Sequence, residues 1–215
     1  MKKVLSIMAM LVIVMAIAIG CSSKQSTTTD SIKNDGSQAL TVNKDKKEVR
    51  IQAEVNGKYF TEATRHGVVY KGGTNGEKSV LRGLVDEKKL YDALLSLGAK
   101  PGNNVKATDT GKNVKIEGTK LNVTVTWDGL GKEIPFSDII TSSEPRPMDI
   151  RFGGNIKTAT AKNTGCILCL DSCPVGITSN AAYAFGESSK IKFYGNKNVL
   201  PKDGTKVTVI FTLAK

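Results

Sequence analysis

Three of the four cysteines of the chain, Cys166, Cys169 and Cys173, lie within eight consecutive positions. Their spacing is C-x2-C-x3-C-P, because Pro174 follows the third cysteine directly. Thiols this close in the sequence can share one metal ion, one iron–sulfur cluster or one disulfide. The sequence therefore predicts that the chemistry of the protein lies in segment 165–176. The fourth cysteine, Cys21, is expected to have a different function.

An iron–sulfur cluster is the first interpretation of this segment. The ferredoxin run of bacteria is C-x2-C-x2-C-x3-C-P, and segment 165–176 contains its opening and closing parts with one cysteine missing. A three-iron cluster, or a fourth ligand from His66 or Asp171, would be needed. The leader carries Lys2 and Lys3 without a twin arginine. It therefore indicates export as an unfolded chain, which a cluster assembled beforehand would not survive.

A single metal ion is the second interpretation. Zinc accepts three cysteines and one histidine, and copper(I) also suits a group of soft thiolates. The only histidine of the chain, His66, precedes a predicted strand 100 residues upstream of Cys166. The candidate ligand set is therefore Cys166, Cys169, Cys173 and His66. At this stage zinc, copper, an iron–sulfur cluster and no cofactor all remain open.

Thiol–disulfide chemistry is the third interpretation, because neighbouring thiols tend to oxidise outside the cytoplasm. Cys166 would be the exposed attacking thiol and Cys169 the resolving one, with Cys173 able to exchange with either. A structural staple is the alternative: one disulfide would hold a loop, and the third cysteine would be buried and inert. A disulfide across so short a loop gains little chain entropy. A redox or metal site is therefore favoured over a staple.

The N-terminal residues have the features of an export signal. Lys2 and Lys3 precede an apolar run over 4–19, and Ala18-Ile19-Gly20-Cys21 resembles the lipobox of bacterial lipoproteins. We expect residues 1–20 to be a lipoprotein signal peptide. Cys21 would be lipidated, and the polar segment 21–46 would be a flexible tether. The folded part would then be anchored to the outer leaflet of the cytoplasmic membrane, outside the cytoplasm.

The charge of the chain narrows the choice of partners. There are 31 basic and 20 acidic residues, a net charge of +11, and removal of residues 1–20 would leave +9. Anionic lipid headgroups or wall polymers, and a redox partner in the membrane, are the expected partners. Nucleic acid is not expected, since the chain has no motif of interleaved aromatic and basic residues. Without a nucleophilic serine motif or paired carboxylates, an enzyme is less expected than a binding or carrier protein. A surface-binding module with stapled cysteines is the alternative function.

Alternation of apolar and polar residues dominates from residue 47 to 215, which predicts one β-rich domain. The expected strands are 49–55, 67–71, 78–83, 113–117, 121–127, 148–152, 190–194 and 207–213. Repeated Asn-Gly and Asp-Gly turns, among them one at residues 56–57, favour an antiparallel, sandwich-like sheet. One helix is expected at 87–97, capped by Asp86 and packed through Leu90, Leu94 and Leu97.

Several motifs also resemble a known family. They are the segments 64–70, 76–83, 93–102 and 151–155 together with the cysteine segment, and they read TRHGVVY, GEKSVLRG, ALLSLGAKPG and RFGGN before it. This combination resembles the YdjY-domain family of exported bacterial proteins, sometimes described as ferredoxin-like. The resemblance covers roughly residues 45–215. It implies export and a cysteine motif, and it implies no particular activity.

Overall fold

The computed structural model describes residues 39–215. The expected signal peptide, Cys21 and most of the expected tether lie outside these residues. Twelve strands and two helices are present in the described part. The strands are β1 Leu40–Asn43, β2 Glu48–Val55, β3 His66–Tyr70, β4 Ser79–Gly83, β5 Lys120–Thr126, β6 Ile134–Pro135, β7 Ile140–Ser142, β8 Ile150–Phe152, β9 Cys166–Cys169, β10 Thr178–Asn180, β11 Phe193–Gly195 and β12 Lys206–Leu213. The helices are α1 Glu87–Ser96 and α2 Ile156–Ala161.

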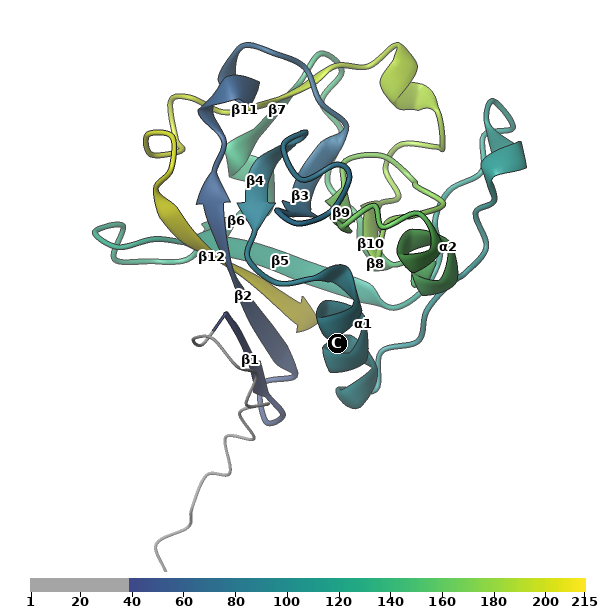
Figure 1. Cartoon of the computed structure of the whole chain (residues 1–215), viewed down its shortest axis with the longest axis horizontal. Helices are drawn as coiled ribbons and strands as arrows, with labels where there is room; N and C mark the ends of the chain where they lie inside the picture. The colour runs from purple at the N-terminus through teal and green to yellow at the C-terminus, as the bar shows by residue number, and fades with distance from the viewer. Residues whose placement is uncertain (1–38) are drawn as a thin grey trace, which may run out of the picture.

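Eight of the strands form one closed sheet (Figure 1). Their order is β2-β12-β5-β8-β10-β9-β3-β4, and β4 pairs with β2 again. β2 is long enough to hold two partners on one edge: its first half pairs with β1 and its second half with β4. The expectation of a mainly β domain is confirmed. The expectation of an open, sandwich-like sheet is wrong, because the pairing of β4 with β2 closes the ring.

Two of the strand pairs are parallel, which corrects the expected antiparallel arrangement. β3 runs parallel to β4, and β9 runs parallel to β10. Parallel neighbours cannot be joined by a tight hairpin, so a crossover segment must carry the chain back to the start of the next strand. Residues 71–78 and 170–177 are these two crossovers. The glycine-rich segment 71–78 and the cysteine segment therefore both serve as crossovers between parallel strands.

The core follows the alternation that the sequence predicts. On β2, Val49, Ile51, Ala53 and Val55 are fully buried, and the residues between them from Arg50 to Glu54 are partly exposed. The expected strand at 113–117 is wrong, because those residues form no strand and only Gly118 pairs, with Pro101. Residues 56–57 do not make a hairpin, since a short 3-10 helix begins at Gly57. β1 lies inside the range expected to be a tether.

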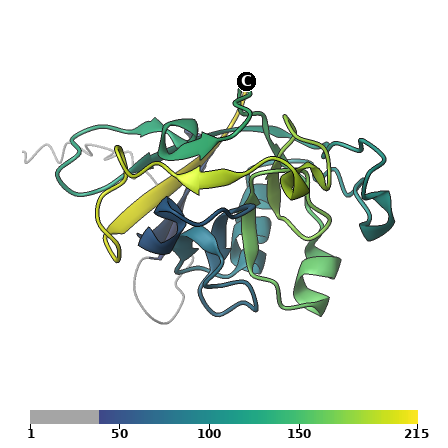
Figure 2. The ribbon, with the colours of Figure 1, turned by 90° about the horizontal axis from the view of Figure 1, so that it is seen from above.

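Helix α1 matches its expectation closely. The Asp86 carboxylate accepts a hydrogen bond of 2.8 Å from the Lys89 amide, and Leu90 and Leu94 are fully buried. Helix α2 was not expected, because it has only six residues and begins after Asn155 in the left-handed conformation, φ 47°. The two helices contact each other, and Figure 2 shows α2 outside the closed sheet. No helix within residues 39–215 is long and apolar enough to cross a membrane.

Candidate functional site

An irregularity in β9 brings Cys166 and Cys169 to the same face. Residues three apart in a regular strand point to opposite faces of the sheet. The pairing of β9 with β3 shifts register twice, between His66 and Val68 and between Val68 and Val69. As a result, two consecutive residues of β9, Ile167 and Leu168, both pack in the main core, and the two cysteines form a separate buried cluster with Cys173.

Gly67 makes this irregularity sterically allowed. A Cβ atom at position 67 would lie 2.8 Å from Leu168 Cδ2 and 3.2 Å from Phe136 Cζ. The first distance is shorter than real carbon contacts, so any side chain here would push the core apart. The absence of a side chain at Gly67 therefore lets Leu168 turn inward beside it.

His66 meets the cysteines, although 100 residues separate it from Cys166. It begins β3 directly opposite Cys169 of β9. Its Nδ1 atom lies 3.8 Å from Cys166 Sγ, and the ligand atoms of His66, Cys166 and Cys169 all lie within 4.8 Å of one another. Three of the four candidate ligands are thus brought together by the pairing of two neighbouring strands.

Cys173, the fourth candidate, belongs to the crossover 170–177. It packs against Cys169 in the same buried cluster but is not part of the close group of three. Asn155 holds the crossover in place: its Nδ2 donates to the carbonyl oxygens of Cys173, at 2.9 Å, and Gly176, at 3.2 Å. The Ile177 amide donates to the Cys166 carbonyl oxygen at 3.0 Å. The Cys173 thiol therefore lies on a segment that these hydrogen bonds hold in place.

The two crossovers and α1 surround the cluster. Asn75, in crossover 71–78, donates through Nδ2 to Cys166 Sγ at 3.7 Å. Glu87, the first residue of α1, is buried and accepts a hydrogen bond of 3.2 Å from the Gly165 amide, which fixes the start of β9. The helix that the sequence predicts purely as a packing element therefore also positions the site.

An ion pair lies on the Cys173 side of the cluster. Arg65 donates through Nε and Nη2 to Oδ1 of the fully buried Asp171, at 3.0 and 2.7 Å. Burial lowers the pKa of the Arg65 guanidinium, but the negative charges of Cys173 and Asp171 raise the pKa further, and the net shift is upward. Asp171, expected as an alternative cluster ligand, is thus the partner of Arg65.

The three thiols share their protons unequally. A hydrogen bond from Cys169 lowers the pKa of Cys166 to about 4; burial opposes this, and a hydrogen bond with His66 assists it. The hydrogen bond with Cys169 also lowers the pKa of Cys173, with help from the charge of Arg65. Hydrogen bonds to Cys166 and Cys173 raise the pKa of Cys169. The middle thiol therefore keeps its proton, and Cys166 carries negative charge at neutral pH.

Burial decides which chemistry is accessible to these thiols. Cys166 and Cys169 have no exposed surface and Cys173 has 2%. The expectation that Cys166 is an exposed attacking thiol is therefore wrong. All three are free thiols within the described residues. A buried thiol cannot reach the disulfide of another protein without local opening of the fold, whereas a buried group of donors suits a metal ion.

The spacing of the donors fits one ion. Metal–sulfur and metal–nitrogen bonds of about 2.3 and 2.0 Å at a tetrahedral zinc place adjacent sulfur and nitrogen ligands about 3.5 Å apart. The observed separation between Cys166 Sγ and His66 Nδ1 is 3.8 Å. An iron–sulfur cluster binds its cysteines through different iron atoms. It therefore needs more widely spaced donors than this compact group provides.

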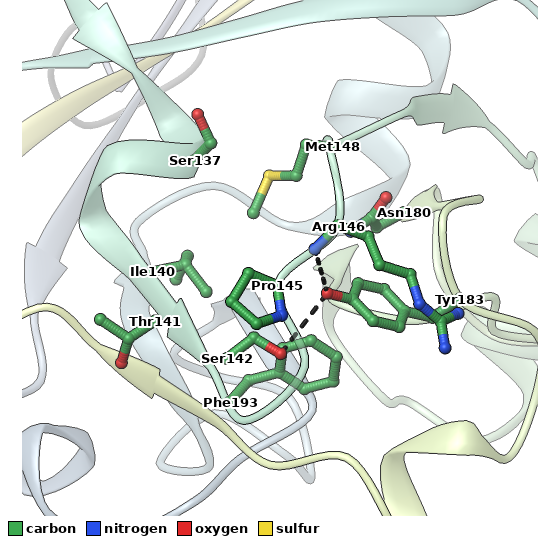
Figure 3. A pocket seen from close by; sticks show the side chains of 10 residues that line it. All are labelled: Ser137, Ile140, Thr141, Ser142, Pro145, Arg146, Met148, Asn180, Tyr183 and Phe193. Atoms are coloured by element: carbon green, nitrogen blue, oxygen red, sulfur yellow. Dashed lines mark hydrogen bonds between the residues drawn. The ribbon is translucent and has the colours of Figure 1, made fainter.

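A separate cavity of about 440 Å³ opens next to this region (Figure 3). Its walls are formed by Ser137, Ile140, Thr141, Ser142, Pro145, Arg146, Met148, Asn180, Tyr183 and Phe193. The charge of Arg146 is already paired with Glu144 and Glu187. The cavity contains none of the cysteines, but its Tyr183 carbonyl oxygen accepts hydrogen bonds from the Ser172 amide and hydroxyl, at 3.0 and 2.7 Å.

The family comparison agrees with this architecture. The YdjY domain matches residues 40–212, from the first residue of β1 almost to the end of β12. The chain belongs to the YdjY-domain family. It is 41% identical over 202 residues to the Escherichia coli (strain K12) protein named "Uncharacterized protein YdjY", which covers 91% of this chain and 89% of that protein. No solved structure matches the chain. In this YdjY domain, a strand of the closed sheet itself carries two of the three clustered cysteines.

Sequence reasoning missed several residues that hold the site. Arg65, Asn75, Asn155 and Ser179 all lie against the cysteines or their crossover, and none has a metal-ligating side chain in a recognisable spacing. Arg65 and Asn155 lie in the family motifs TRHGVVY and RFGGN, and Arg65 directly precedes the candidate ligand His66. These positions were the available signals.

Proposed function

We propose that this protein is a lipid-anchored metal-binding protein on the outer face of the bacterial cytoplasmic membrane. Its cluster would hold one soft ion, Zn²⁺ or Cu(I), with Cys166, Cys169, Cys173 and His66 as ligands. The observation that carries the proposal is the convergence of His66 Nδ1, Cys166 Sγ and Cys169 Sγ within 4.8 Å. Thiolate and imidazole donors are the set that such ions prefer.

Burial and ligand number support a closed site. Structural zinc sites use four protein ligands and leave no open position, whereas catalytic sites keep one position for water. Here three donors are already close together, and Cys173 packs against Cys169 on the adjoining crossover. The Cys173 thiol would be the fourth ligand. The proposed role is therefore to hold or carry an ion rather than to catalyse hydrolysis.

The charges around the cluster support the same assignment. Three thiolates and one neutral imidazole around Zn²⁺ carry a net charge of −1, and a buried charge is costly without a partner. Arg65 supplies a positive charge beside Cys173, and its interaction with that thiol raises the pKa of its guanidinium. The Arg65 side chain is 30% exposed, so part of it reaches solvent.

Electron exchange is a second candidate, favoured by the contact between the Cys166 thiolate and the Cys169 thiol. Oxidation would form one S–S bond, releasing two electrons and the Cys169 proton. A membrane quinone would accept both electrons together with that proton and a second one from water, and would become a quinol. Electrons can reach a buried pair without direct contact, so burial is compatible with this role.

The export part of the proposal rests on the sequence alone. The leader 1–20 and the lipobox ending at Cys21 precede the described residues. Lys44, Lys46 and Lys47 lie in the turn between β1 and β2 and would face the membrane surface. Anionic headgroups or wall polymers are the proposed partners of this basic segment.

Metal analysis of the full-length protein tests the proposal. The protein is purified from membranes in detergent under anaerobic conditions, and its metal, sulfide and free-thiol contents are measured. We expect one equivalent of zinc or copper, lost in Cys169→Ser and reduced in His66→Ala. Tyr70→Phe, a conservative change on β3 outside the ligand set, is the matched control and should keep its metal.

Three other outcomes would change the assignment. Iron together with sulfide would replace the single ion with a cluster. No metal and only one free thiol among the three would overturn the metal proposal and leave electron exchange. No metal with three stable free thiols, unaffected by membrane quinones, would overturn both.

A further inference from the structure

Two buried polar atoms next to the cluster have no hydrogen-bond partner. Within residues 39–215, Asp171 Oδ2 and Ser179 Oγ are the only buried side-chain nitrogen or oxygen atoms in this state. Ser179 is fully buried on β10 and pairs directly with Cys169 in the parallel register of β9 and β10. Buried hydroxyl groups in folded proteins almost always have a partner. The Ser179 hydroxyl is therefore a donor at the candidate site that no other protein group within residues 39–215 uses.

Gly176 shows where the Ser179 hydroxyl lies. A Cβ atom at position 176 would stand 2.7 Å from Ser179 Oγ and 3.0 Å from Cys169 Sγ. The hydroxyl oxygen and the sulfur therefore border the same small space, which exists because residue 176 has no side chain. Asn155 holds the Gly176 carbonyl oxygen at 3.2 Å and so keeps the crossover at this distance from β9.

The chemistry of a metal-bound cysteine would give the Ser179 hydroxyl a partner. The Cys169 sulfur lies between two other thiols and interacts with both. A cysteine that binds a metal is a thiolate, and a thiolate only accepts hydrogen bonds. The hydroxyl of Ser179 borders the same space, has no other partner among the described residues and can rotate to donate to this sulfur.

We propose that Ser179 is a positioning residue that donates a hydrogen bond to the Cys169 sulfur in the metal-loaded protein. This inference rests on the proposed metal site. The hydroxyl has no partner within residues 39–215, and the metal-bound sulfur would supply one, so the hydrogen bond favours the loaded state over the empty one. This hydrogen bond would orient the Cys169 sulfur towards the ion and stabilise the negative charge of the thiolate. Outer partners of this kind typically change metal affinity 10- to 100-fold.

Ser179→Ala tests the inference, with Thr178→Val as the matched control. Thr178 is the preceding residue of β10, is also fully buried, and donates through Oγ1 to the Ile167 carbonyl oxygen at 2.8 Å. Each substitution removes one buried hydroxyl, but only the Thr178 hydroxyl has a hydrogen-bond partner within the described residues. The full-length protein is used for both, in reductant.

Three quantities are measured: Zn²⁺ affinity by competition with a chelator, the sulfur-to-metal absorption bands of the Co²⁺-loaded protein, and thermal unfolding of the metal-free protein. For Ser179→Ala we expect zinc affinity to fall roughly 10- to 100-fold, shifted cobalt bands, and an unchanged or higher metal-free melting temperature. For Thr178→Val we expect a lower metal-free melting temperature with zinc affinity and cobalt bands unchanged.

Two results would overturn the role of Ser179. One is a Ser179→Ala protein with the affinity and cobalt bands of the wild type. The other is a metal-free Ser179→Ala protein that melts as early as Thr178→Val or fails to fold, because the hydroxyl would then already be bonded through a buried water. Failure of the wild type itself to bind Zn²⁺, Co²⁺ or Cu(I) would instead overturn the proposed function.

Discussion

Removal of Arg65 should destabilise the protein far more than removal of an exposed surface lysine. In Arg65→Met the carboxylate of Asp171, which has no exposed surface, loses both hydrogen bonds from Arg65, its one charged partner within residues 39–215. Loss of one member of a buried ion pair costs about 3–5 kcal/mol, because the other charge remains buried and unpaired. The Arg65 side chain is 30% exposed, so water already screens part of the pair. We therefore expect the lower end, about 3 kcal/mol.

This free energy converts into a measurable shift of the melting temperature. For a domain of 150–250 residues, each kcal/mol lowers the melting temperature by about 2–4 °C. Arg65→Met should then melt about 6–12 °C below the wild type. The assay is thermal and urea unfolding of the metal-free, reduced, full-length protein, so that any change in metal affinity does not enter the comparison.

Two further variants separate charge from packing. Arg65→Met/Asp171→Asn removes both charges and should recover part of the lost stability. Lys58→Met is the surface control: Lys58 pairs with Glu62, and their side chains are 53% and 61% exposed. Exposed pairs contribute about 0–1 kcal/mol. The reasoning is refuted if Arg65→Met unfolds at the urea concentration of Lys58→Met, or if the double variant is no more stable than Arg65→Met.

Two other predictions concern the cysteines. The hydrogen bond from Cys169, with His66 assisting, lowers the pKa of Cys166 from 9.0 to about 4. The ultraviolet absorption of the Cys166 thiolate should therefore persist in the reduced, metal-free protein until the pH falls to about 4, and Cys166→Ser should lose the part of the absorption that Cys166 contributes. The stabilisation that Cys166 contributes is complete above pH 9 and is lost as the pH falls towards 4; a thiol that titrates near 9 would contradict this. Separately, Cys21→Ser should abolish acylation of the protein, measured by the mass of the purified chain, and a variant that keeps the mass of an acylated chain would argue against lipid anchoring at this residue.

The sequence predicted those features that depend on local pattern. Alternation on β2 identified Val49, Ile51, Ala53 and Val55 as core, since the side chains of a strand alternate between its two faces. The cap and the apolar spacing of α1 were sufficient to predict this helix, because capping and helical periodicity act over only one or two turns. The chemical types of the candidate ligands were also evident, because thiols and imidazole bind metals in any fold.

Only the tertiary structure decided how these parts meet. The alternation of apolar and polar residues shows which face of a strand is buried but not which strand lies beside it. The closure of β4 onto β2 and the two parallel pairs could therefore not be predicted. The shift in register that turns Cys166 and Cys169 to one face depends on the pairing of β9 with β3, strands about 100 residues apart. The same holds for His66 beside Cys166 and for Ser179 beside Cys169. These contacts are set by the closed sheet, because hydrogen bonds between strands fix the neighbours of each side chain regardless of their distance in sequence.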